Sequence, residues 1–68
     1  MYRLFRVTFS VTDEKGYELF EQVFVGVPIT AKSIETDMAE ALLAAHRLRA
    51  FGKAIRIELE SEKGLFII

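Results

Sequence analysis

Cysteine is absent from this sequence, histidine and proline occur once each, and nine basic against ten acidic residues leave a net charge of only −1. Without cysteine the chain can form neither a disulfide nor a thiolate metal site, and it has no cysteine nucleophile. Its apolar runs are far shorter than the roughly 20 residues needed to cross a bilayer, and the N-terminus lacks a basic-then-apolar signal pattern. We therefore expect a soluble, unprocessed protein of the cytoplasm with no membrane partner.

The residue groupings that catalysis or metal binding requires are also missing. His46 has no neighbouring residues with which to form a metal site or a catalytic triad. Ser10, Ser33 and Ser61 fall on a strand face, at a helix cap and in a turn, and none stands in a nucleophile elbow. The glycines do not form a phosphate-binding motif. We predict that the chain is not an enzyme and that it holds no metal and no cofactor.

The apolar residues, in contrast, suffice for one small core. Of the 68 residues 51% are hydrophobic, among them six Phe and two Tyr. A chain of this size buries only about 60% of its unfolded surface when it folds, so there is room for one domain, spanning residues 1–68.

Two alternating segments predict a β-hairpin in the first half. Residues 2–11 alternate with the period of a half-buried strand, and residues 17–27 form a second β-rich run. A polar turn that ends in Gly16 separates them. If the turn is Asp13 to Gly16, Thr12 faces Tyr17.

That register would join four aromatic residues on one face of the hairpin. Phe9 would lie opposite Phe20, and Phe5 opposite Phe24. A slip of one residue would scatter the Phe side chains over both faces, so we favour the aromatic pairing.

The second half predicts a helix and a second hairpin. The helix should occupy Ala31 to Phe51, with Thr30 or Ser33 as the N-cap and Gly52 as the stop. Residues 53–60 alternate again, and a turn at residues 61–64 leads to a short strand at 65–68.

The predicted fold is α+β with the order ββαββ: an antiparallel four-stranded sheet, strand order 2-1-3-4, with the helix packed on one face. The predicted core comprises Phe5, Phe9, Phe20, Phe24, Ile34, Met38, Ala41, Leu42, Ala45, Leu48, Ile55, Ile57, Leu59 and Phe66.

Two surfaces are candidates for function. The sheet face turned away from the helix is unusually apolar in the predicted register, which favours binding of a protein partner or of a second copy. Its expected partner-binding residues are Tyr2, Leu4, Arg6, Leu19, Val23 and Val25, with Val27, Leu65 and Ile67 on the same face. The alternative is a small nucleic-acid-binding protein that contacts phosphates through basic residues, namely Arg6, Arg47, Arg49, Lys53 and Arg56.

The helix from Ser33 to Phe51, the strand Lys53-Ala54-Ile55-Arg56-Ile57-Glu58-Leu59-Glu60 and the turn into Gly64-Leu65-Phe66-Ile67 make up about half of the chain. In this layout the sequence resembles small phage and mobile-element proteins, among them some phage anti-CRISPR proteins. The resemblance implies a compact sheet-plus-helix protein that inhibits a CRISPR surveillance complex by binding it, in the host cytoplasm. Our leading hypothesis rests on the apolar outer face together with this resemblance: the chain is a non-enzymatic protein-protein interaction module, of the phage-inhibitor type, that binds a larger protein complex.

Overall fold

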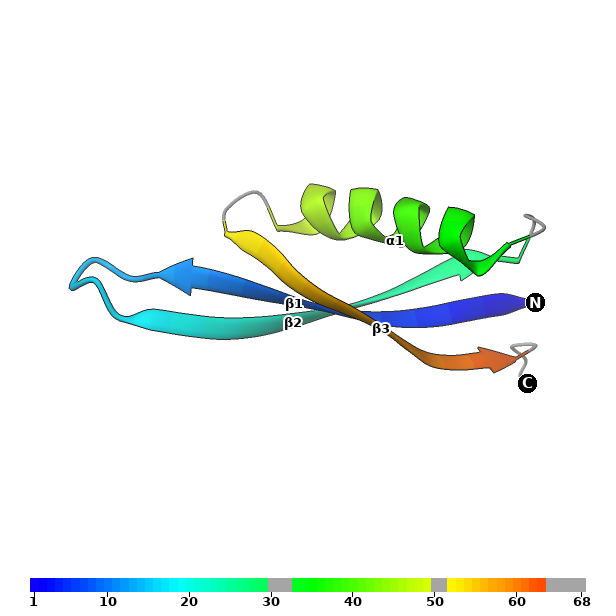
Figure 1. Ribbon diagram of the computed structural model, residues 1–68, viewed down its shortest axis with the longest axis horizontal. Coiled ribbons are helices and arrows are strands. Elements are labelled where there is room, and N and C mark those ends of the chain that lie inside the picture. Colours follow the sequence, from blue (N-terminus) through cyan, green and yellow to red (C-terminus); the bar gives the residue numbers. More distant parts are fainter. Residues whose placement is uncertain (30–32, 50–51, 64–68) are drawn as a thin grey trace.

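The sheet has three strands, and one helix lies along one of its faces (Figure 1). The structure is a computed structural model that describes residues 1–29, 33–49 and 52–63. Its elements are β1 (Tyr2–Thr12), β2 (Glu18–Pro28), α1 (Ile34–Leu48) and β3 (Lys53–Lys63). The sheet is antiparallel with the order β2-β1-β3. The α+β class and the place of β1 between β2 and β3 are as predicted. The turn expected to begin at Ser61 was wrong, because β3 continues to Lys63, and the expected fourth strand, residues 65–68, lies outside the described residues.

The loop of the first hairpin differs from the predicted turn by one residue. The Gly16 N–H donates to the Asp13 carbonyl at 3.0 Å, and the Asp13 N–H donates to the Tyr17 carbonyl at 2.9 Å. Gly16 has φ 89°, in the left-handed region that glycine adopts at little cost. A tight turn followed by a left-handed glycine is a common three-residue hairpin loop. Thr12 therefore pairs with Glu18 and not with Tyr17, and the predicted register was wrong.

This shift by one residue turns the side chains of β2 to the opposite faces of the sheet. Phe5 lies opposite Val25, and Val7 lies opposite Val23. Phe20 and Phe24 consequently point away from the helix, with exposures of 60% and 54%. The predicted aromatic core face does not form.

The core lies between α1 and the facing side of the sheet, which we call the helix side. Its buried members are Phe5, Val7, Phe9, Val25, Val27, Ala41 and Ala45. Among the other predicted core residues, some pack partly buried against this cluster: Ile34, Met38, Leu42 and Ile57. Others are exposed, contrary to the prediction: Phe20, Phe24, Leu48, Ile55 and Leu59. Phe66 lies outside the described residues.

The start of α1 follows from its capping residue. Ser33 has extended backbone angles, and its side chain accepts the Thr36 N–H at 3.4 Å. Ser33 is thus the N-cap, one of the two predicted candidates. Glu35 and Asp37 follow in the first turn, where carboxylates interact favourably with the helix dipole.

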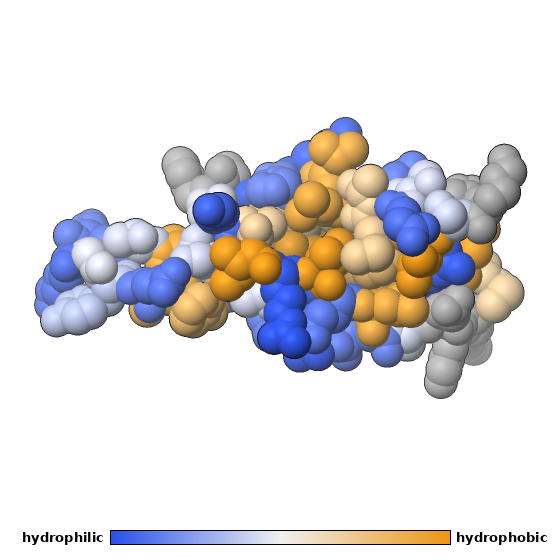
Figure 2. All heavy atoms as spheres, in the orientation of Figure 1, coloured by the Kyte–Doolittle hydropathy of each residue, from blue (hydrophilic) through white to orange (hydrophobic). Residues whose placement is uncertain are grey.

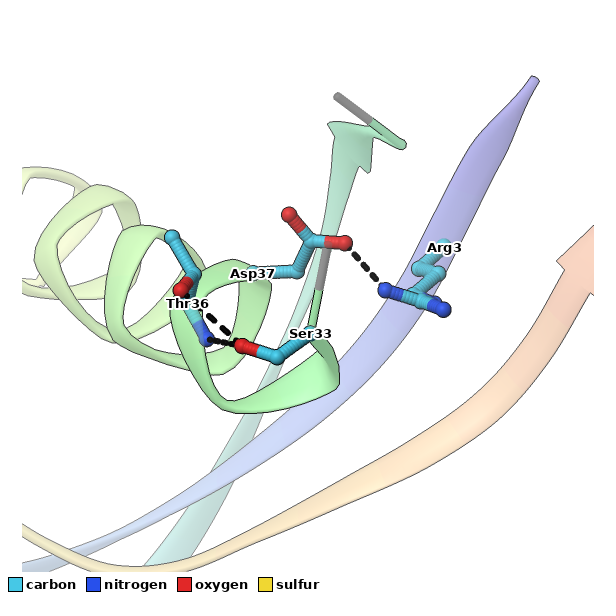
Figure 3. A network of polar contacts seen from close by, with 4 residues as sticks. All are labelled: Arg3, Ser33, Thr36 and Asp37. Carbon is cyan, nitrogen blue, oxygen red and sulfur yellow. Dashed lines mark hydrogen bonds and ion pairs between the residues drawn. The ribbon is translucent and has the colours of Figure 1, made fainter. Parts of the chain in front are cut away.

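An ion pair connects the beginning of β1 to the beginning of α1. Arg3 Nη1 contacts Asp37 Oδ2, as Figure 3 shows. The side chain of Asp37 is only 3% exposed and that of Arg3 15%. Arg3 belongs to the same alternating set as Phe5 and Val7, so its side chain lies on the helix side of the sheet. The pair places a buried charge at the edge of the core.

Candidate functional site

The sheet face turned away from α1, which we call the outer face, carries a group of exposed large apolar residues. Large apolar side chains project from it although no described element covers it. They are Tyr2, Leu4, Phe20 and Phe24. In the strand register Phe24 is the diagonal neighbour of Leu4, and Tyr2 approaches the bare backbone at Gly26. Phe20 lies four residues from Phe24 along β2, about 13 Å away.

Charged side chains adjoin this apolar surface and neutralise one another. Arg6 lies between Phe24 on β2 and Glu58 on β3. It forms ion pairs with Glu60 at 2.5 Å and with Glu58 at 3.4 Å. Glu58 also contacts Arg56, at 3.2 Å. The outer face is therefore an apolar patch beside a nearly neutral cluster of charges.

The structure divides the predicted partner-binding residues between the two faces of the sheet. Tyr2, Leu4 and Arg6 lie on the outer face, as predicted. The placement of the other three on the same face was wrong, because the hairpin register is shifted: Leu19, Val23 and Val25 pair with Val11, Val7 and Phe5 on the helix side. Val27 is likewise buried on the helix side. Leu65 and Ile67 lie outside the described residues.

Sequence reasoning missed Phe20 and Phe24, the two most prominent residues of the outer face. The signal for their exposure was present in the loop. Asp13 accepts the N–H groups of Lys15 and Tyr17 on its side-chain Oδ1, both at 2.9 Å. An Asp that begins a turn, followed by Gly three residues later, is typical of the three-residue loop that the chain adopts.

The basic residues of the alternative interpretation are distributed over several parts of the surface. Arg49, just after α1, binds Glu21 of β2 at 2.7 Å. Arg56 lies on the outer face of the sheet and binds Glu58, whereas Arg47 projects from α1 beside Glu40. The structure does not bring Arg47, Arg49, Lys53 and Arg56 together into one patch of unpaired positive charge.

The single histidine makes a packing contact. The ring of His46 meets that of Phe9 edge to face, with 5.3 Å between the centroids and an interplanar angle of 82°. Within the described residues, no group of three or more His, Cys, Asp or Glu side chains is placed to hold a metal ion. In the same part of the chain, no helix has the length and hydrophobicity to cross a membrane.

Comparisons of the chain with protein-family models, with curated proteins and with solved structures gave no match.

Proposed function

We propose that the chain is a non-enzymatic protein-binding module whose outer face docks onto a larger protein. The observation that carries this proposal is the exposure of Phe20 and Phe24, two aromatic side chains projecting from the same strand. Aromatic residues bury large areas at little conformational cost and are enriched at the centres of protein interfaces. A sheet face that only faced water would carry polar residues at these positions.

The charges beside the patch favour a protein partner over a nucleic acid. Phosphate binding requires basic side chains that are free to neutralise phosphate charge. Three of the five basic residues in the alternative interpretation already bind carboxylates in the structure: Arg6, Arg49 and Arg56. A neutral cluster at the rim of an apolar patch suits a protein surface, where such charges set the orientation of the partner.

The resemblance to small phage proteins of the anti-CRISPR type supports a large protein complex of the host as the partner. On this proposal the chain acts as a phage-type inhibitor in the host cytoplasm, and it works by occupying a surface of that complex. Inhibition by occupation requires no catalytic group.

A double substitution on the outer face tests the proposal. Phe20→Ser together with Phe24→Ser removes both aromatic rings at positions where their loss should cost little stability. The tagged parent and the variant are used to capture proteins from the native host, and affinity for the captured protein is then measured by titration. We expect the double variant to bind at least about 30-fold more weakly, because aromatic residues that act as interface hot spots contribute about 2 kcal/mol or more.

Leu43→Ser is the matched control, because Leu43 is exposed to the same degree as Phe20 but projects from α1. It should bind like the parent. A second measurement titrates single-stranded DNA and RNA at increasing salt concentrations. Equal binding by the parent and the double variant would contradict the proposal. Tight nucleic-acid binding that falls steeply with salt and is lost in Arg47→Glu/Arg49→Glu would establish the alternative function.

A further inference from the structure

The strand β3 forms an edge of the sheet that no other described element covers. β1 pairs with it on one side only. α1 lies mainly over β2 and β1, so the apolar side chains of β3 on the helix side are incompletely covered. Ile55 is 50% exposed and Leu59 38%. A long edge strand with free backbone groups is a template for pairing with another chain.

A shallow apolar groove runs between this strand and the helix. It is lined by Leu42 of α1 and, on β3, by Ala54, Ile55 and Ile57, with Arg56 at its margin. In Figure 2 hydrophobic side chains gather where α1 and β3 lie in Figure 1. An apolar partner strand placed against β3 would cover part of this surface.

The sequence of β3 is complementary to itself in the antiparallel direction. When two copies pair about a twofold axis through Ile57, Arg56 of each copy lies opposite Glu58 of the other. The same alignment places Ile55 opposite Leu59 of the second copy. Opposite charges therefore meet on the outer face, and apolar side chains meet on the helix side.

The neighbouring registers are unfavourable. An axis through Arg56 places the two copies of this cation opposite each other, and an axis through Glu58 does the same with two carboxylates. An axis between two residues would place apolar side chains of one copy against charged ones of the other, because side chains alternate between the faces.

Two bulges restrict the pairing further. Ile55 and Glu60 have no partner on β1, because the register shifts at both points. Between them, Arg56–Leu59 forms a regular stretch that contains Ile57 and the charged residues on either side of it. Bulges interrupt regular strand pairing, so they disfavour long edge-to-edge contacts that could form in several registers. They leave only a short stretch of β3 that can pair regularly with another strand.

We infer that β3 pairs with β3 of a second copy, in the register centred on Ile57, and that the protein forms a twofold-symmetric dimer with a continuous sheet. This dimer uses the β3 edge and leaves the outer-face aromatics Phe20 and Phe24 free. The inference is thus independent of the proposed function.

A pair of charge reversals tests the inference by sedimentation equilibrium. In Arg56→Glu, carboxylates of the two copies face each other, and in Glu58→Lys cations do. Each variant alone should dimerise about tenfold or more weakly than the parent, because two favourable pairs become two repulsive ones. An equimolar mixture of the two variants restores opposite charges at both contacts. We expect it to dimerise like the parent.

The variants are suited to this test because they leave the core unchanged. The Arg56 side chain is 68% exposed, and Arg6 keeps Glu60 as a partner when Glu58 is replaced. If Glu58→Lys fails to fold, Arg56→Glu alone still weakens self-association if the inference is right. Phe20→Ser/Phe24→Ser is the control, and it should dimerise like the parent.

Two results would overturn the inference. One is a parent that remains a monomer up to millimolar concentration. The other is dimerisation that the charge reversals leave intact and the Phe20→Ser/Phe24→Ser control abolishes, which would assign self-association to the outer face.

Discussion

Replacing Arg3 by Met should be among the most damaging single substitutions outside the apolar core. Arg3→Met keeps much of the side-chain length but leaves the carboxylate of Asp37, which is only 3% exposed, without its ion-pair partner. Removing one member of a buried pair typically costs about 3–5 kcal/mol. A domain of this length has a total stability on the order of 3–10 kcal/mol. We expect Arg3→Met to cost about 3 kcal/mol, which is enough to unfold much of the protein at moderate temperature.

Replacing Asp37, the other member of the pair, should cost less stability. In Asp37→Leu the side chain of Arg3 is 15% exposed to water, and Arg3 has a further interaction besides its pair with Asp37. The remaining losses are the ion pair itself and a helix-dipole contribution of about 0.5 kcal/mol. In the double variant the buried carboxylate is removed together with the guanidinium that it faces, so its stability should lie within about 1 kcal/mol of the parent. The coupling between the two sites is then about 2 kcal/mol or more.

Urea denaturation followed by circular dichroism measures the stability of all four proteins in this double-mutant cycle, namely the parent, the two single variants and the double variant. Arg6→Met is the control, because Arg6 forms ion pairs on the outer face with a side chain 33% exposed. Ion pairs that are partly open to water, as these are, typically contribute about 1 kcal/mol or less. If Arg3→Met cost no more than Arg6→Met, or if the double variant were as unstable as Arg3→Met, the pair would not be the buried connection between β1 and α1.

Two further predictions concern the backbone and the core. Gly52→Ala should cost about 2 kcal/mol, because Gly52 has φ 106° and an added Cβ would lie 3.0 Å from Val11 Cγ2. Gly16→Ala, with φ 89° but no atom within 4 Å of the added Cβ, should cost only about 1 kcal/mol, and thermal melts of the two variants check the difference. Phe9→Ala should cost about 3–5 kcal/mol and Phe20→Ala less than about 1 kcal/mol, as measured by urea denaturation.

The sequence predicted those features that depend on a single element. The alternation in residues 2–11 and 53–60 indicated strands, and the apolar stripe indicated the helix that lies at Ile34–Leu48. Ser33 was recognisable as an N-cap candidate because a hydroxyl there can accept a backbone N–H of the first turn. These features are encoded within a few neighbouring residues.

The features that were missed depend on how elements are placed against each other. Arg3 shares the alternation of Phe5 and Val7, which marks it as a polar residue on the core side, but its partner Asp37 lies 34 residues away in the chain. The incomplete cover over Ile55 depends in the same way on where α1 crosses the sheet. Neither could be inferred from periodicity, because periodicity describes a face and not what packs on it.

The wrong hairpin register affected the predicted core and the predicted outer face more than any other error, and the physical reason for it can be tested. β2 carries apolar residues on both faces, so hydrophobic alternation alone does not select a register. The predicted register would bury Phe20 and Phe24, but it would also turn Gln22 to the helix side, and a buried amide without a partner costs about 1–3 kcal/mol. The observed register buries Val25 and Val27 instead.

The two registers make opposite predictions for one pair of substitutions. In the predicted pairing Phe9 and Phe20 are core neighbours, so Phe9→Ala and Phe20→Ala would each cost about 3–5 kcal/mol. In the structure Phe9 is fully buried whereas Phe20 is 60% exposed, so only the first should be costly. The difference between the two losses of stability should therefore exceed about 2 kcal/mol. Comparable losses of stability in both variants would instead support the predicted register, in which Phe20 is buried in the core. Phe20 would then not lie on the outer face, and the proposed docking surface would be contradicted.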